Sequence, residues 1–182
     1  MLKVSISSQR ACSLARLLGC EEHSLTHPST KIRYDASFAA NVTGPAVVSA
    51  IFRPLLFKSA KPYSVYISSG LGSMGISSDK THPYYYPHQG IPNAETYRAS
   101  KAALNQIALQ ESILYRETPL KVFVMCPGLV VSNLRGTSED ARTGWGMAGD
   151  PEVSGQTLLS IIDGKRDADV GKFVHKDGVY PW

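Results

Sequence analysis

The sequence predicts an α/β domain built on a parallel sheet. From about residue 33 onward, helical and strand-like patterns alternate along the chain. Two runs of β-branched and aromatic residues, Ser64–Ser69 and Leu120–Cys126, are each followed at once by a glycine-containing turn. The 182 residues are 43% hydrophobic and 19% charged, which suits one domain with a substantial core. Short strands that alternate with helices are typical of a parallel sheet.

The first third of the chain contains one clear helix. Residues 1–30 are rich in serine and hold a single strand-like piece at Leu2–Ile6. A helix is expected over Arg33–Leu56, where apolar residues recur at helical spacing. We expect a kink at Gly44-Pro45, because proline removes a hydrogen-bond donor and crowds the preceding turn.

The middle third reads as strand, loop and helix. Ser64–Ser69 is expected to be a buried strand. Residues 70–95 are rich in glycine, proline, tyrosine and serine and are expected to form a long loop. Thr96 is expected to be the N-cap of a helix that runs to about Glu117.

The last third repeats the pattern. Leu120–Cys126 is expected to be the second buried strand, closed by Pro127-Gly128 and followed by a loop over residues 129–149. Asp150-Pro151 is a typical helix start, and this helix is expected to end at Gly164. The tail Lys172–Trp182 is expected to hold a short strand and a turn at Asp177-Gly178.

Charge and composition argue against several classes of function. The net charge of +4 comes from 19 basic and 15 acidic residues that form no basic run, so no nucleic-acid partner is expected. No stretch approaches about 20 apolar residues, so no membrane partner is expected either. The three cysteines lack metal-ligand spacing, which favours a reduced, cytoplasmic protein without a metal site.

Tyr97 and Lys101 are the first candidates for chemistry. They are four residues apart on a predicted helix, so their side chains share a face. Free tyrosine titrates near 10, and a nearby ammonium is expected to lower the pKa of Tyr97 and make proton transfer feasible. This spacing also occurs by chance, so an interfacial tyrosine and lysine remain the alternative.

Two further segments favour the catalytic interpretation. Ser69 ends one predicted strand, and the sequence CPGLVVS ends the next. In an open α/β sheet, ligands bind at the carboxyl ends of the strands. A serine at that edge is able to donate a hydrogen bond to a carbonyl oxygen on which charge develops. Three signals therefore converge on one rim of one sheet.

This combination resembles the short-chain dehydrogenase/reductase family. The matching segments are NVTGPAVVSAIFRPLL, YISSGLG, YRASKAALN and PGLVVS, and the resemblance runs from about Arg33 to Trp182. It implies a partial Rossmann-like, doubly wound parallel sheet that lacks the first βαβαβ half. Residues 1–182 are then a single, amino-terminally truncated domain in which residues 1–30 are atypical.

The resemblance also implies roles for individual residues. Tyr97 is expected to be the catalytic acid or base, while Lys101 lowers its pKa and holds the nicotinamide ribose. Ser69 is expected to orient the substrate oxygen, and Asn41 to hold a water that links Lys101 to solvent. The residues that it assigns to the cofactor NAD(P)(H) are Tyr97, Lys101, Pro127, Gly128, Val130 and Ser132.

The sequence departs from the family at its amino terminus. It lacks the strand, glycine-rich turn and helix that bind the pyrophosphate. Leu2–Ser8 is one candidate for the family's fourth strand. Gly70–Gly75 spells G-x-G-x-x-G, but we expect no helix to begin after Gly75 and therefore do not interpret it as a phosphate loop.

Two functions remain open at this point. The first is an NAD(P)-dependent oxidoreductase that transfers hydride between the cofactor and a carbonyl or alcohol substrate, with NADP slightly favoured over NAD. The second is a catalytically incompetent remnant that acts only in oligomerisation. In either case, a homo-oligomer through helices 33–56 and 96–117 is expected from the resemblance. The loop around Tyr84, Tyr85 and Tyr86 is either a substrate-facing insertion or a mobile surface loop.

Overall fold

The structure is a computed structural model that describes residues 27–86 and 94–182. The chain divides into two compact units, Met1–Asp35 and Ala36–Trp182. The second unit holds the sheet and the candidate site, and the description below concerns it. The predicted strand at Leu2–Ile6, the candidate fourth strand at Leu2–Ser8 and the atypical character of residues 1–30 fall mostly outside the described residues. The expected single domain stays a prediction.

The first helical run is longer than expected. It comprises α2 (His27–Phe38), the π-helical turn η1 (Ala39–Thr43) and α3 (Gly44–Leu56). The expected start at Arg33 was therefore wrong, because Pro28 lies in a first turn, where proline costs no hydrogen bond. A π-helical turn directly precedes Gly44-Pro45, and the amide of Gly44 donates to Ala39 O. The helix thus departs from α-helical bonding where the kink was expected.

The sheet has four strands in the order β1-β2-β3-β4. These are β1 (Tyr63–Ile67), β2 (Lys121–Met125), β3 (Phe173–His175) and β4 (Gly178–Tyr180). The first three strands are parallel, and β4 returns antiparallel to β3 after the turn expected at Asp177-Gly178. The predicted α/β class is confirmed, and the sheet is mixed because of this last hairpin.

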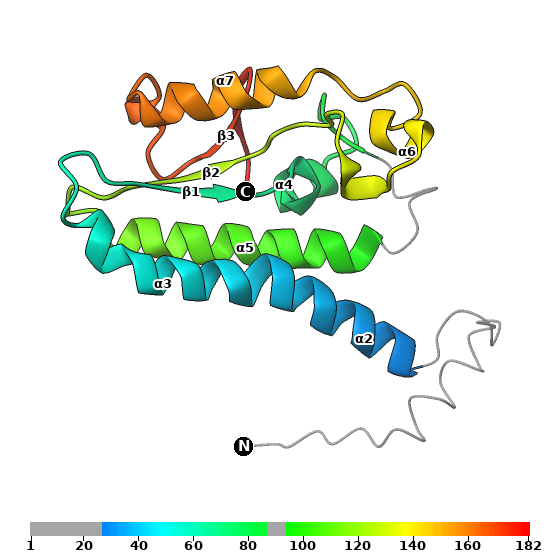
Figure 1. The fold of residues 1–182 in the computed structure, drawn as a ribbon, viewed down its shortest axis with the longest axis horizontal. Coiled ribbons are helices and arrows are strands. Elements are labelled where there is room, and N and C mark those ends of the chain that lie inside the picture. The colour runs from blue at the N-terminus through cyan, green and yellow to red at the C-terminus, as the bar shows by residue number, and fades with distance from the viewer. Residues whose placement is uncertain (1–26, 87–93) are drawn as a thin grey trace. The chain divides into compact units, whose positions relative to one another are not determined.

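Helices cover both faces of the sheet (Figure 1). Helix α7 (Pro151–Ile162) covers one face, and α5 (Ala94–Leu114) covers the other with α3 beside it. Strand β2 feeds both cores because successive side chains point to opposite faces. Val122 and Val124 pack with Leu104 of α5, whereas Phe123 packs with Ile161 of α7.

Short helices replace parts of the expected loops. Residues 70–78 form the 3-10 turn η2 (Gly70–Gly72) and helix α4 (Met74–Ser78). Helix α4 begins at Met74, before Gly75, so residues 75–78 lie in a short helix where a loop was expected. The Ser73 hydroxyl caps this helix by accepting from Ile76 N at 3.0 Å. Loop 129–149 contains η3 (Asn133–Arg135) and α6 (Glu139–Thr143), and η4 (Asp167–Asp169) precedes β3. Helix α5 begins at Ala94, so Thr96 lies inside it and is not its N-cap.

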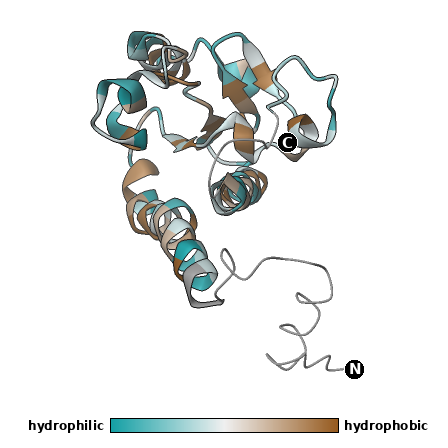
Figure 2. Ribbon diagram, turned by 90° about the vertical axis from the view of Figure 1, so that its right-hand side faces the viewer, coloured by the Kyte–Doolittle hydropathy of each residue, from teal (hydrophilic) through white to brown (hydrophobic). Residues whose placement is uncertain are grey.

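Helix α3 is apolar but has no buried residue. Its exposed apolar side chains include Val47, Val48, Ile51, Phe52 and Leu55, and its composition can be followed in Figure 2. The helical run Thr30–Leu56 is long and apolar enough to cross a membrane by length and composition alone, which the sequence did not predict. Helix α3 also makes a polar contact with α5, where Arg53 forms an ion pair with the buried Glu111 at 2.8 Å.

Candidate active site

The carboxyl ends of β1 and β2 form one rim of the sheet. Ile67 and Met125 are partners in the parallel register, and the amide of Ser68 extends the ladder by donating to Met125 O at 2.8 Å. Ser68 and Cys126 therefore follow the two strands side by side, and Ser69 and Pro127 come next. The predicted convergence of the two post-strand segments has this geometric basis.

Ser69 occupies the turn that follows β1. It has extended backbone angles and is the N-cap of η2, and its hydroxyl accepts from Leu71 N at 3.2 Å. The Ser69 side chain also lies close to the Tyr97 side chain, and their interaction lowers the pKa of Tyr97. The structure thus brings together two residues that are far apart in the sequence.

Tyr97 and Lys101 lie one helical turn apart in the amino-terminal half of α5. The Lys101 Nζ atom lies 5.8 Å from the centre of the Tyr97 ring and donates to Ile67 O at 2.9 Å. Both side chains are only partly accessible to solvent. Lys101 is therefore fixed to the end of β1 while the Tyr97 phenol points to Ser69.

The pKa values at this site reflect burial. Burial is the largest effect on Tyr97 and raises its pKa above 10, although the interaction with Ser69 opposes the change. Burial also lowers the pKa of Lys101. The expectation that Lys101 would lower the pKa of Tyr97 was wrong for the chain alone, because desolvation of the phenolate outweighs the attraction of an ammonium beyond direct contact.

Asn41 lies in η1 and reaches α5. Its Nδ2 donates to Ser100 Oγ at 3.0 Å, and that hydroxyl donates to the carbonyl of Tyr97 at 2.8 Å. Asn41 and Lys101 also line one groove of about 580 Å³ between α3 and β1. Asn41 therefore lies near the other candidates, joined to them through the backbone of α5.

The segment after β2 is held by its own contacts. Gly128 has φ of +78°, and a Cβ built there meets no atom within 4 Å, so the space above it is open. Val130 O accepts from Arg135 Nη2 at 3.0 Å, and the Ser132 hydroxyl caps η3. These bonds pre-form the loop that was assigned to the cofactor.

Sequence reasoning missed Cys126. Its sulfur accepts from Gly70 N at 3.2 Å and from Gly128 N at 3.4 Å, so it joins the turns that follow β1 and β2. Burial raises the pKa of this thiol. The signal in the sequence was its position, because Cys126 is the last residue before Pro127 at the end of the second strand. The Pro127 carbonyl accepts from Ser154 Oγ at 2.5 Å.

Sequence reasoning also missed a buried polar pair, Ser68 and Asn105, beside the turn of residues 69–75, which is called the serine turn below. Ser68 Oγ donates to Asn105 Oδ1 at 2.5 Å, and Asn105 Nδ2 donates to Gly72 O at 3.3 Å. Asn105 lies one turn beyond Lys101 on α5, a spacing that marked it as a neighbour. These two hydrogen bonds fix where the serine turn lies along α5.

The glycines of the G-x-G-x-x-G segment are packed against protein. A Cβ at Gly72 would stand 2.7 Å from the backbone carbon of Lys101, and one at Gly75 would stand 2.7 Å from Pro181 Cβ. Glycine is required here for close packing of chain on chain. The rejection of a phosphate loop at this segment therefore has a direct physical reason.

Comparisons with known proteins find relatives of this chain. The short-chain dehydrogenase/reductase tropE of Talaromyces stipitatus is 34% identical over 151 residues, which are 80% of this chain and 56% of that protein. The short-chain dehydrogenase/reductase eupG of a Phoma species is 30% identical over 161 residues, 82% of this chain and 58% of that protein. The chain thus spans little more than half the length of these relatives. No family model matches the chain.

A solved structure gives the same fold. The NADPH-bound carbonyl reductase from chicken fatty liver superposes with a TM-score of 0.66 at 24% identity, covering 96% of this chain and 71% of that protein. The parallel β1-β2-β3 order, the serine after β1 and the tyrosine-lysine pair on α5 accompany these sequence likenesses. The chain belongs to the short-chain dehydrogenase/reductase family.

Proposed function

We propose that this chain carries the catalytic part of an NAD(P)-dependent oxidoreductase that acts on a carbonyl or alcohol substrate. The observation that carries the proposal is the placement of Ser69, Tyr97 and Lys101 close together at the carboxyl rim of a parallel sheet. Ligands bind at this rim in open α/β folds. The relatives at 30% and 34% identity, which are named short-chain dehydrogenases/reductases, support it further.

Tyr97 is proposed to move the proton. Its raised pKa keeps the phenol protonated at neutral pH, so it is ready to donate to a substrate oxygen that gains charge during reduction. Ser69 is proposed to orient the same oxygen by hydrogen bonding. Because the Ser69 and Tyr97 side chains lie close to each other, both groups are proposed to reach the same substrate oxygen. In the reverse reaction, oxidation of an alcohol, Tyr97 must accept the proton as a phenolate. The phenolate requires stabilisation by a further positive charge or hydrogen bond when cofactor and substrate are bound.

Lys101 and Asn41 are proposed to support Tyr97. Lys101 Nζ has three donors and uses one on Ile67 O, which leaves donors for the hydroxyls of a ribose. Asn41 lines the groove beside Lys101 and is proposed to hold a water that reaches solvent. Neither role involves bond formation with the substrate, so both residues position the proton donor.

The described residues fit the nicotinamide end of a dinucleotide. Tyr97 and Lys101 stand on one side, and the pre-formed segment Pro127–Ser132 stands on the other, with open space above Gly128. A bound nicotinamide would supply or accept the hydride. The pyrophosphate needs converging amides at a helix amino terminus, and the glycine-rich turn among the described residues is closed by Lys101 and Pro181.

NADP is the proposed cofactor. The chicken carbonyl reductase, which shares the fold, was solved with NADPH bound. The residue that reads the ribose in related folds follows a second strand of the first half, a region that this sequence does not match. The choice therefore rests on the structural neighbour, and the cytoplasmic location and substrate class remain predictions.

Activity assays with matched tyrosine variants test the function. NADPH oxidation with a panel of aldehydes and ketones is measured for this chain at millimolar cofactor and for any longer product of the same gene. Tyr97→Phe is expected to lower kcat about 10²–10⁴-fold, because only the proton-transfer group is lost. Tyr115→Phe is the control, since Tyr115 directly follows α5 and lies far along it from the rim. Equal activity of Tyr97→Phe and the parent chain would refute the assignment.

A second function is favoured by the surface of α3. Its exposed residues Val47, Ile51 and Leu55 form one apolar stripe, in line with the expected oligomer through helices 33–56 and 96–117. A remnant without activity could still pair through this stripe. Light scattering distinguishes the two outcomes: Ile51→Asp should release monomers if the stripe is an interface, whether or not the chain is active.

A further inference from the structure

We infer that the carboxyl-terminal residues Tyr180–Trp182 are a positioning element of the active site, which presses the turn of residues 69–75 against α5 and so holds the Ser69 hydroxyl in place. The inference rests on the proposed function, because it concerns the hydroxyl that would orient the substrate. The supporting contacts come from three parts of the chain.

The serine turn lies outside the sheet ladder. Strand β1 ends at Ile67, and the last ladder bond after it is made by Ser68 N. The position of Ser69 therefore depends on the turn that follows, in which Gly72 N donates to Ser69 O at 2.8 Å and Leu71 N donates to Ser69 Oγ at 3.2 Å. Whatever fixes this turn also fixes the hydroxyl.

Helix α5 supports the turn on one side. Gly72 lies directly against the backbone of Lys101, and the Asn105 amide donates to Gly72 O at 3.3 Å. These contacts set how closely the turn approaches the helix that carries Tyr97. Without a support on the opposite side, the turn could still move away from α5.

The tail supplies that opposite support. Ser73 Oγ donates to Pro181 O at 2.6 Å, and Gly75 N donates to Trp182 O at 2.5 Å. The ring of Tyr180 lies over Gly70, where an added Cβ would be 3.2 Å from it. Three successive tail residues thus contact three residues of the turn that begins at Ser69.

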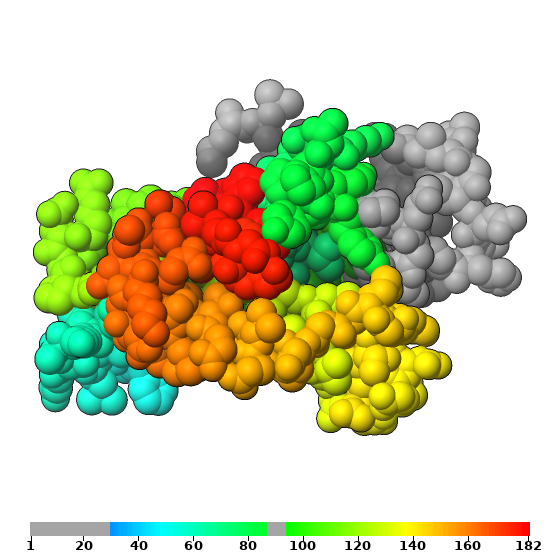
Figure 3. Space-filling view, turned by 90° about the horizontal axis from the view of Figure 1, so that it is seen from above, coloured from blue at the N-terminus to red at the C-terminus, as the bar shows by residue number. Residues whose placement is uncertain are grey.

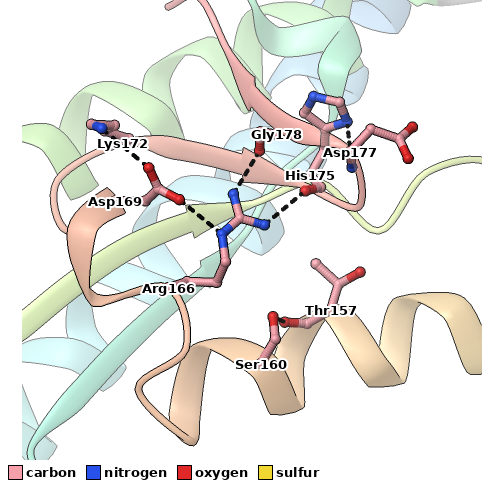
Figure 4. Close-up of polar contacts among 8 residues, drawn as sticks. All are labelled: Thr157, Ser160, Arg166, Asp169, Lys172, His175, Asp177 and Gly178. Atoms are coloured by element: carbon pink, nitrogen blue, oxygen red, sulfur yellow. Dashed lines mark hydrogen bonds and ion pairs between the residues drawn. The ribbon is translucent and has the colours of Figure 1, made fainter.

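The tail is itself anchored in the core. The Trp182 ring stacks on the fully buried Phe173 with centres 6.0 Å apart, and Tyr180 meets Phe173 edge-on at 5.4 Å. Arg166 bonds both strands of the hairpin that carries the tail, donating to His175 O at 3.3 Å and to Gly178 O at 2.9 Å (Figure 4). The tail is therefore packed against the buried core and held by the hairpin.

The loop that precedes α5 is joined to the same support. Tyr84 lies edge-on to Tyr180 and to His175, each at 5.1 Å, and its hydroxyl bonds Asp177 at 3.2 Å. In Figure 3 the red carboxyl-terminal residues lie beside the green segment that includes this loop. Among the described residues, Tyr84 is thus anchored to the β3–β4 hairpin, and both interpretations of the loop stay predictions.

Amide hydrogen exchange on the full 182-residue chain tests the inference. Gly75→Ala places a methyl group where Pro181 stands and should push the tail off the turn, and deletion of Pro181 and Trp182 removes it. The amides of Leu71, Gly72 and Ile76 should then exchange at least about tenfold faster, while those of Ser68 and Cys126 in the sheet keep their rates.

Gly155→Ala is the matched control. Gly155 lies in α7, and a Cβ built there meets no atom within 4 Å, so the same substitution should leave every rate unchanged. Unchanged exchange of the turn amides in Gly75→Ala would overturn the inference. Equal acceleration in the turn and the sheet would overturn it too, because the tail would then hold the whole fold and not the serine turn.

A second readout links the turn to the proton donor. Carbon-13 NMR of labelled tyrosine follows the titration of Tyr97, assigned by its loss in Tyr97→Phe. Ser69→Ala should raise the pKa of Tyr97, because the interaction that lowers it is lost. Tail deletion should produce a rise in the same direction, and the combined variant no further rise. If tail deletion leaves the titration unchanged while Ser69→Ala shifts it, the tail does not position the hydroxyl.

The two proposals fail in different ways. If Ser69→Ala leaves the titration of Tyr97 unchanged, the Ser69–Tyr97 pair of the proposed function is absent from the solution state. The exchange rates of Leu71 and Gly72 still report whether the tail holds the turn.

Discussion

Helices α5 and α3 lie on the same side of the sheet but differ in how the chain covers them. Helix α5 buries eight residues, among them Leu104, Ala108, Asn105 and Glu111, and it carries Tyr97 and Lys101. Helix α3 is richer in apolar residues but buries none. The difference teaches that residues fixed by surrounding protein carry the candidate chemistry, whereas the apolar surface of α3 lacks a cover among the described residues. The relatives are longer chains, and a patch of this kind normally marks an interface.

The largest expected loss of stability comes from a substitution in α5. Leu104 is 2% exposed in the core shared by α5 and the sheet. Leu104→Ala should lower the free energy of unfolding by about 2–5 kcal/mol, because it removes buried methyl groups and leaves a cavity. Urea denaturation measures it, and a loss below about 1 kcal/mol would show that this core is not packed as described.

The next effect concerns the buried carboxylate between the two helices. Burial tends to raise the pKa of Glu111, but hydrogen bonds from Ser49, Tyr66 and Arg53 outweigh it and hold the pKa below its ordinary value. The folded state therefore binds this proton less readily than the unfolded state. The stabilisation is present above the ordinary pKa of Glu and is lost as pH falls through the lower, folded pKa.

Glu111→Gln should therefore cost about 1–3 kcal/mol at pH 7, because charge-assisted bonds are lost. It should also flatten the acid limb of stability against pH. Glu117→Gln is the control, since its side chain is 89% exposed. Thermal unfolding from pH 3 to 7 measures both variants, and a Glu111→Gln curve parallel to that of the parent chain would contradict this linkage.

The smallest effect is expected on α3. Leu55 is 57% exposed, so Leu55→Ala should change the free energy of unfolding of the monomer by no more than about 0.5 kcal/mol. This is the same substitution as Leu104→Ala, made in the other helix. A cost above about 1.5 kcal/mol that grows with protein concentration would show instead that a second copy covers α3.

The sequence predicted the parts that depend on local pattern. Tyr97 and Lys101 share a face because their spacing matches a helical turn, and Ser69 and Pro127 reach one rim because both follow parallel strands. The pKa direction at Tyr97 was wrong, because spacing along a helix does not reveal how deeply the phenol is buried.

Contacts between distant segments could not be predicted from the sequence. Tyr180 reaches Gly70 only because β4 folds back on β3, and no spacing in the sequence encodes that return. The glycines at 72 and 75 look alike in a phosphate loop and in a close packing contact, and only the positions of Lys101 and Pro181 distinguish the two.

Titration of the chain with NADPH and with its reduced nicotinamide mononucleotide fragment tests the central claim most directly. The described residues form the proposed nicotinamide site but no open phosphate-binding turn, so the two ligands should bind with similar, roughly millimolar affinity. Both should shift the NMR signals of Tyr97, Lys101 and Gly128. Micromolar binding of NADPH alone would reveal a pyrophosphate site in this chain and contradict the account, as would the absence of any shift at these three residues with either ligand.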